Sequence, residues 1–162
     1  MVLTEAQIWE YLEDVRDPEI PVINIVELGV LRSVSLDGDA VTVNITPTYS
    51  GCPAMRVMEE DIIAKLHSEG ISKVEVKKTY KPAWTTDDIR ESGREKMKAY
   101  GIAPPLAANP KLHFLANDER TVCCPRCSSS NTLMKSLFGS TSCKALYYCN
   151  DCQEPFDYFK CL

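Results

Sequence analysis

The sequence predicts an α+β protein: a two-layer α/β domain with the order helix, strand, strand, helix, strand, followed by a small C-terminal four-cysteine zinc ribbon. Apolar residues alternate along 30–45 and 74–76, which is the period of half-buried strands, whereas they recur at helical spacing along 8–15 and 55–66. Near its C-terminus the chain carries two Cys-x-x-Cys pairs, which are typical of a metal-held ribbon.

The composition limits the classes of function. The chain has 162 residues, of which 44% are hydrophobic and 25% are charged, so it can bury one sizeable core and a small second unit. A net charge of -5 argues against a nucleic-acid partner, because phosphate contacts need clustered Lys and Arg. Neither a membrane-spanning stretch nor a signal peptide is evident. We therefore expect a cytoplasmic protein whose eight cysteines are metal ligands or reactive thiols rather than disulfides.

The chain begins with a predicted helix and an acidic loop. Thr4 with Gln7 forms a capping box at the helix start, and Pro18 predicts its end, because the residue before a proline avoids the helical region. Two prolines then surround Asp17 and Glu19. We expect this stiff backbone to display both carboxylates, either at a site or only to solvent.

A hairpin is predicted next, because Asp37-Gly38 is typical of a two-residue type I′ turn. In that register Val34 pairs with Val41, and one face of the hairpin is apolar except for Arg32. A helix that ends at Gly70 covers this face with four apolar side chains: Met55, Met58, Ile62 and Leu66.

The turn between that hairpin and that helix contains Gly51, Cys52 and Pro53. Pro53 suits the first turn of a helix, so Cys52 is expected at or next to the N-cap. Unpaired N–H groups and the helix dipole favour a thiolate there, which lowers the pKa of the thiol, whereas nearby carboxylates would raise it. Cys52 is therefore a candidate nucleophile or soft-metal ligand, and the alternative is a buried structural cysteine.

Three motifs of the first half resemble the signature of the MIP18-like iron–sulfur assembly family: Asp17-Pro18-Glu19-Ile20-Pro21, Leu28-Gly29-Val30 and Thr48-Tyr49-Ser50-Gly51-Cys52-Pro53. The resemblance implies a cytosolic factor that builds or delivers iron–sulfur or other iron centres. Cys52 is then the candidate functional thiol, a transient ligand of iron or of an iron–sulfur cluster. Its candidate neighbours in the site are Asp17, Glu19 and Thr48.

Beyond these motifs, a third helix is expected from an N-cap at Thr85 to about Tyr100, with Gly101 as its stop. Residues 103–110 contain three prolines and no periodicity, which predicts a semi-rigid linker. The predicted domains are 1–100 for the α/β domain with its added helix, 101–120 for the linker and 121–162 for the ribbon.

The two Cys-x-x-Cys pairs predict one metal site per chain with the ligands Cys124, Cys127, Cys149 and Cys152. Four thiolates leave no open coordination position, so the metal is structural. Zinc is favoured and an iron–sulfur cluster is the alternative, since four cysteines alone do not separate the two. Cys123 could replace Cys124 only at the cost of the compact spacing, and His113 is a poor alternative ligand.

Two more cysteines lie near the ribbon. If the strands on either side of the second pair run antiparallel about Cys152, then Cys143 and Cys161 face each other. They would be two small buried side chains, or else a redox pair or a second soft-metal site.

Four motifs of the second half resemble the family of accessory D proteins of bacterial phenylacetyl-CoA epoxidase systems: residues 82–87, 100–105, 138–147 and 154–161. The resemblance implies a part in aerobic phenylacetate degradation, with the oxygenase or reductase components of the epoxidase as partners. A homo-oligomer is a further form of assembly that the sequence leaves open. The chain lacks the helical Glu-x-x-His pairs of a di-iron oxygenase, which agrees with an accessory protein without catalysis of its own.

Two functions follow from this resemblance. The first is a maturation factor in which Cys52 passes iron or a cluster to the epoxidase. The second is a non-catalytic docking or scaffold module, whose surface would be the ribbon with Phe156, Tyr158 and Phe159. Thiol catalysis is a third and less favoured hypothesis, because no histidine is placed in the sequence as an obvious base for Cys52.

Overall fold

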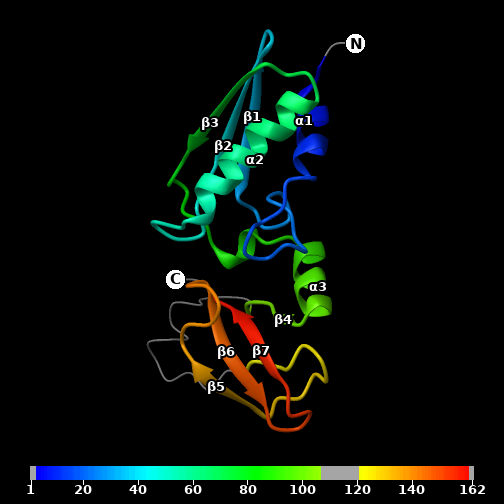
Figure 1. The fold of residues 1–162 in the computed structure, drawn as a ribbon, viewed down its shortest axis with the longest axis vertical. Coiled ribbons are helices and arrows are strands. Elements are labelled where there is room, and N and C mark those ends of the chain that lie inside the picture. Colours follow the sequence, from blue (N-terminus) through cyan, green and yellow to red (C-terminus); the bar gives the residue numbers. More distant parts are fainter. Residues whose placement is uncertain (1–2, 107–120, 161–162) are drawn as a thin grey trace. The chain divides into compact units, whose positions relative to one another are not determined.

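The computed structural model describes residues 3–106 and 121–160, which belong to two compact units, Met1–Gly93 and Arg94–Leu162. Within the described residues, the first unit contains a three-stranded sheet and the second a four-stranded sheet, so the α+β class is confirmed (Figure 1). No helix in the described ranges has the length and apolar character needed to span a bilayer.

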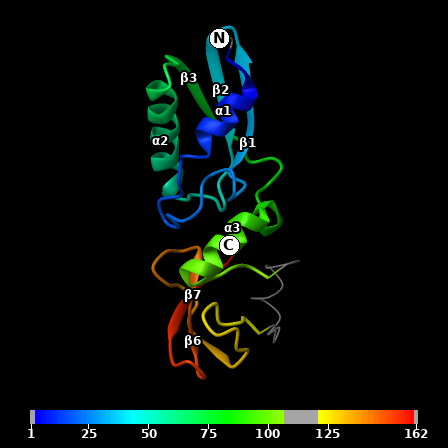
Figure 2. The same ribbon diagram turned by 90° about the vertical axis from the view of Figure 1, so that its right-hand side faces the viewer.

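The first unit has two layers. Helices α1 (Glu5–Leu12) and α2 (Ala54–Ser68) cover one face of a sheet with the order β1 (Leu31–Asp37), β2 (Ala40–Ile45) and β3 (Lys73–Lys78) (Figures 1 and 2). β1 and β2 are antiparallel, whereas β3 is parallel to β2 and needs a crossover connection, which α2 provides. The predicted order of helix, strand, strand, helix, strand is confirmed.

The core of this unit includes the residues that the two periodicities predicted, together with apolar residues of the segment before β1, such as Ile20, Ile23, Ile25 and Leu28. Buried side chains on α2 and on β2 are Met55, Met58, Ile62, Leu66, Val41, Val43 and Ile45. Burying a side chain of this size contributes about 1.5–3 kcal/mol. The helix ends as expected, because Gly70 has a φ of 86°, a left-handed conformation that costs glycine little.

The hairpin register differs from the expected one. Gly38 and Asp39 form the two-residue connection, and Gly38 has a φ of 60° at the position where a type II′ turn requires glycine. Val34 therefore pairs with Val43 rather than with Val41. Because side chains alternate with a period of two, this even shift preserves the predicted apolar face from Ser33 to Asp37. At the start of β1, an irregularity between Leu31 and Ser33 makes Leu31 the partner of Ile45, where Val30 was expected.

Helix α1 begins at its predicted capping box but ends at Leu12, before the expected stop at Pro18. The next residues form tighter turns, in which the N–H groups of Glu13, Asp14 and Val15 each donate to the carbonyl three residues earlier. Val15 is buried as its helical spacing predicted, so the apolar pattern continued beyond the regular helix.

The expected third helix is interrupted. After Thr85, a 3₁₀ turn (Thr86–Asp88) comes first, and α3 (Glu91–Tyr100) begins three residues later. The side chain of Asp88 accepts a hydrogen bond from the N–H of Thr85, so the capping signal was genuine but belongs to the short turn. The strand-like backbone of Ile89 separates the two pieces.

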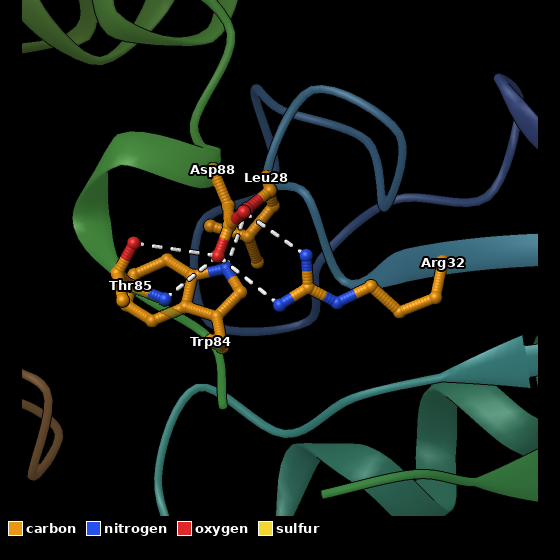
Figure 3. Close-up of polar contacts among 5 residues, drawn as sticks. All are labelled: Leu28, Arg32, Trp84, Thr85 and Asp88. Atoms are coloured by element: carbon orange, nitrogen blue, oxygen red, sulfur yellow. Dashed lines mark hydrogen bonds and ion pairs between the residues drawn. The ribbon is translucent and has the colours of Figure 1, made fainter. Parts of the chain in front are cut away.

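Trp84 and Asp88 attach this turn to the sheet (Figure 3). The indole Nε1 of Trp84 donates to the carbonyl oxygen of Leu28 at 2.9 Å, and two guanidinium nitrogens of Arg32 donate to the Asp88 carboxylate at 3.0 and 3.1 Å. This bidentate pair explains why an arginine interrupts the apolar face of β1. Gly29 has a φ of 75°, and a Cβ there would stand 2.3 Å from the Asp88 carbonyl oxygen, so only glycine allows this approach.

Asp88→Asn is expected to lower the free energy of unfolding of the first unit by about 1.5–3 kcal/mol at neutral pH, the range for hydrogen bonds to charged groups. Burial raises the pKa of Asp88, but its bonds to Arg32 outweigh this and lower the pKa from 3.8. The stabilisation is therefore present above about pH 4 and is lost as the pH falls through the lowered pKa.

Urea unfolding followed by tryptophan fluorescence tests this, since both tryptophans, Trp9 and Trp84, lie in the first unit. The matched control is Asp87→Asn, because Asp87 is the exposed neighbour of Asp88. We expect the two variants to differ at pH 7 and to converge at pH 3. Equal stabilities at pH 7 would show that the ion pair contributes nothing.

The second unit is built on a sheet with the order β4 (Ile102–Ala103), β7 (Pro155–Phe159), β6 (Lys144–Cys149) and β5 (Thr132–Ser136). Its buried cluster is Ala103, Val122, Cys124, Ala145, Tyr147, Cys149, Phe156 and Tyr158. The rings of Tyr147 and Phe156 stack with centroids 5.7 Å apart.

The first residues of the expected linker are structured. Gly101 ends α3 with a φ of 96°, as predicted, but Ile102 and Ala103 are buried and pair with Asp157 and Tyr158 of β7. Ala103 belongs to the buried cluster of the second unit. The high proline content of the segment gave no sign of this strand. The remainder of the predicted linker from residue 107 lies outside the described residues.

Candidate functional site

Cys52 lies in the turn between β2 and α2. The turn closes through a hydrogen bond of 3.3 Å from the Cys52 N–H to the carbonyl of Tyr49, and Gly51 has a φ of 80°. Pro53 is the N-cap residue of α2 and has no side-chain cap, so Cys52 directly precedes the helix start as expected. The thiol is half-buried.

The pKa of Cys52 is raised rather than lowered, although both expected influences, the helix start and a nearby carboxylate, act on it. Burial raises the pKa of the thiol above 9.0, and it outweighs the hydrogen bond from the backbone of Ala54 at the helix start. The negative charge of Glu19 raises the pKa further, whereas hydrogen bonds from the side chains of Thr48 and Tyr49 lower it. The balance of these effects favours the thiol over the thiolate at Cys52.

The two loop acids differ in their surroundings. Glu19 is half-buried and close enough to Cys52 to act on its charge. Asp17 is buried, and its Oδ1 accepts from the N–H groups of Glu19 and Ile20 at 2.8 and 2.6 Å. The expectation that the backbone displays both carboxylates is therefore wrong for Asp17, which shapes the loop that holds Glu19.

The structure thus brings Cys52, Glu19 and Thr48 together, and it adds Tyr49, which the sequence pattern did not single out. Its position three residues before Cys52 in the same tight turn was the available signal. A sulfur, a carboxylate and two hydroxyls offer soft and hard ligands side by side. A cation placed among them would be attracted by the carboxylate and would favour loss of the thiol proton.

The predicted metal cluster is assembled in the ribbon. The sulfur atoms of Cys124, Cys127, Cys149 and Cys152 all lie within 4.8 Å of one another. Across the two pairs, Cys124 and Cys152 are 3.7 Å apart and Cys127 and Cys149 are 3.6 Å apart. Cys123 is exposed and outside the cluster, which contains Cys124 instead, while His113 lies outside the described residues.

Each Cys-x-x-Cys pair is held in a tight loop. Ser128 and Gln153, each one residue past a pair, have φ values of 61° and 60°, which lets the following backbone turn back toward the sulfurs. The N–H groups of Cys152 and Asp151 lower the pKa of Cys149 to about 7, whereas burial and the neighbouring sulfurs raise the pKa of Cys152 to about 12. Such N–H donors stabilise a thiolate, which is the form that binds metal.

The register that was predicted to place Cys143 opposite Cys161 is off by one residue. Cys143 is buried and stands opposite Lys160, whose N–H donates to the Cys143 carbonyl at 2.8 Å. The connection between β6 and β7 has four residues between Cys149 and Glu154, so the pairing is centred half a residue before Cys152. That offset moves every partner by one residue. Cys161 itself lies outside the described residues.

The fold and these sites define a class of protein: an iron–sulfur-assembly type α/β domain joined to a four-cysteine ribbon. Residues 5–77 match the iron–sulfur cluster assembly protein family, and residues 108–160 match the PaaD zinc beta ribbon domain. The chain is 44% identical to a protein of Escherichia coli (strain K12) assigned as the D component of a 1,2-phenylacetyl-CoA epoxidase, over 96% of this chain and 92% of the relative. The chain therefore belongs to the family of D components of phenylacetyl-CoA epoxidases.

Relatives of the first unit alone are also known. An Fe-S protein maturation auxiliary factor of Porphyromonas gingivalis is 39% identical, over 54% of this chain and 85% of the relative. A domain of unknown function, DUF59, from Bacillus anthracis matches with a TM-score of 0.53 and 26% identity, over 56% of this chain and 87% of its own. A conserved hypothetical protein of Thermotoga maritima matches with a TM-score of 0.50 and 29% identity, over 59% of this chain and 94% of its own.

Proposed function

We propose that the chain is a cytoplasmic accessory factor of a phenylacetyl-CoA epoxidase system, which assists assembly or delivery of an iron–sulfur or di-iron centre. The observation that carries this proposal is the grouping of Cys52 with Glu19, Thr48 and Tyr49 at the start of α2. The similarity of the first unit to an Fe-S maturation factor supports it. The partners would be the oxygenase or reductase components.

The raised pKa of Cys52 suits a ligand that must also release its metal ion. Metal binding competes with the proton, because the thiol has to lose it to coordinate, and a thiol that is protonated at rest binds more weakly than a preformed thiolate. Glu19 opposes this weakness by attracting the cation. Together they make Cys52 a ligand for a metal in transit rather than for a resident ion.

The ribbon cluster holds one structural zinc in this proposal. Zinc bonds to thiolate are about 2.3 Å long, so a tetrahedral site separates its sulfurs by about 3.8 Å. The separations of 3.7 and 3.6 Å fit a single ion. A cluster distributes its four cysteines over two or more irons, which spreads the sulfurs further apart.

A docking module is the second candidate. The expected docking aromatics do not support it, because Phe156, Tyr158 and Phe159 are buried. They belong to a strand whose alternating side chains fill the ribbon core. A different observation favours docking: in the second unit several large apolar side chains on and after β5 are exposed, namely Leu133, Met134, Leu137 and Phe138.

Anaerobic iron binding tests the proposal. We expect the full chain to bind about one ferrous ion beyond its zinc, with a thiolate-to-iron absorption band that Cys52→Ser abolishes. Glu19→Gln should weaken iron binding about tenfold, equivalent to 1.4 kcal/mol. The same change should lower the Cys52 pKa and so speed its alkylation, because a negative charge is removed.

Glu19→Gln should thus weaken iron binding but speed the alkylation of Cys52. A variant that merely disturbed the fold of the site would not be expected to show this combination. Mass spectrometry of the peptide that contains Cys52 resolves its alkylation from that of the other thiols. Unchanged iron binding by Cys52→Ser would place the iron site elsewhere and favour the docking module.

A further inference from the structure

The two Cys-x-x-Cys loops of the ribbon are joined by side chains that are not metal ligands. The hydroxyl of Ser129 donates to Oδ2 of Asp151 at 2.5 Å, and Nδ2 of Asn131 donates to its Oδ1 at 2.7 Å. Asn131 is held in turn by Asn150, whose backbone N–H and side-chain amide donate to the Asn131 carbonyl and Oδ1 at 2.9 and 3.0 Å. Both oxygens of one carboxylate thus tie the first loop to the second.

The same residues also supply hydrogen bonds to the sulfurs. The backbone of Ser129 bonds to Cys127, and the backbone of Asp151 bonds to Cys149. These two sulfurs are 3.6 Å apart and come from different loops. The Ser129 to Asp151 bond therefore connects the two backbone segments that orient one sulfur pair across the site.

We propose that the contact between Ser129 and Asp151, supported by Asn131, locks the two loops together and slows release of the bound metal. This inference rests on the zinc site proposed above. Metal leaves a four-thiolate site by stepwise opening, in which one loop must move away from the other. A bond between the loops opposes that movement and keeps the remaining sulfurs placed for rebinding.

Metal release from the zinc-loaded full chain tests this, with a chromophoric chelator in excess at fixed pH. We expect Ser129→Ala and Asp151→Ala each to speed release about tenfold, the lower end of the range for residues that support metal ligands. The double variant should speed release by less than the product of the two single effects, because both changes remove the Ser129 to Asp151 bond, although each also removes one bond to Asn131. Ser129→Thr keeps the hydroxyl and should restore slow release.

Ser130→Ala is the matched control, since it removes the hydroxyl of the exposed neighbour. Ser129→Ala leaves the Asp151 charge in place, so faster release by this variant cannot come from a lost carboxylate. Equal release rates for Ser129→Ala and Ser130→Ala would overturn the lock while leaving the zinc site standing. A chain that neither contains nor takes up zinc would overturn both the zinc site and the lock.

Discussion

Cys52→Ser is expected to abolish growth on phenylacetate while it leaves the fold and the ribbon metal intact. The substitution removes the one sulfur in a group of otherwise oxygen ligands, and Cys52 is only half-buried, so the loss of packing is small. Serine keeps the size of the side chain but does not deprotonate to a soft ligand. A growth assay of a complemented deletion strain measures the effect.

The matched control for this prediction is Cys123→Ser, because Cys123 is exposed and outside the metal cluster. That strain should grow normally. Circular dichroism and zinc analysis of purified Cys52→Ser should match the parent chain. If both cysteine variants support growth equally, the functional thiol lies elsewhere and the docking module becomes the better account.

Cys124→Ser or Cys149→Ser is expected to release one metal ion per chain and to unfold the ribbon. Both sulfurs belong to the cluster, and both side chains are buried in the core of the second unit. Structural zinc contributes about 10–16 kcal/mol of binding free energy that is also folding free energy, far more than a small ribbon core supplies. The first unit has its own core and should remain folded.

Metal analysis combined with hydrogen exchange measures both parts of this result. Protection should be lost along β5, β6 and β7 and retained along β1 and β2. Cys123→Ser serves again as the control and should keep its metal. Full metal retention in a chain that carries both ligand substitutions would show that these cysteines do not hold the ion.

The cluster of four cysteines could be predicted because their spacing is local. Two residues between cysteines bring two sulfurs to one ion whatever the surrounding fold, and the choice of Cys124 over Cys123 followed from that spacing alone. The buried faces of α2 and β2 were equally predictable, since they depend only on the period of apolar residues. The wrong hairpin register still preserved the apolar face from Ser33 to Asp37, but the irregularity before Ser33 was missed.

The parts that were missed depend on contacts between distant residues or on burial. Arg32 pairs with Asp88 across 56 positions, and no local pattern reports such a contact. Desolvation has the largest effect on the pKa of Cys52, and it depends on burial in the fold. The helix start, which the sequence did predict, has a smaller effect on that pKa. Asp17 was expected as a displayed acid because its role as a backbone acceptor depends on how the loop folds.

Metal analysis of the epoxidase components tests the maturation role most directly. The oxygenase and reductase components would be purified anaerobically from strains that carry the parent chain, Cys52→Ser or Cys123→Ser, and compared at equal protein. We predict that the components from the Cys52→Ser strain are made at normal levels but lack most of their iron or labile sulfide. Fully metallated and active components from that strain would contradict a role of Cys52 in metal delivery.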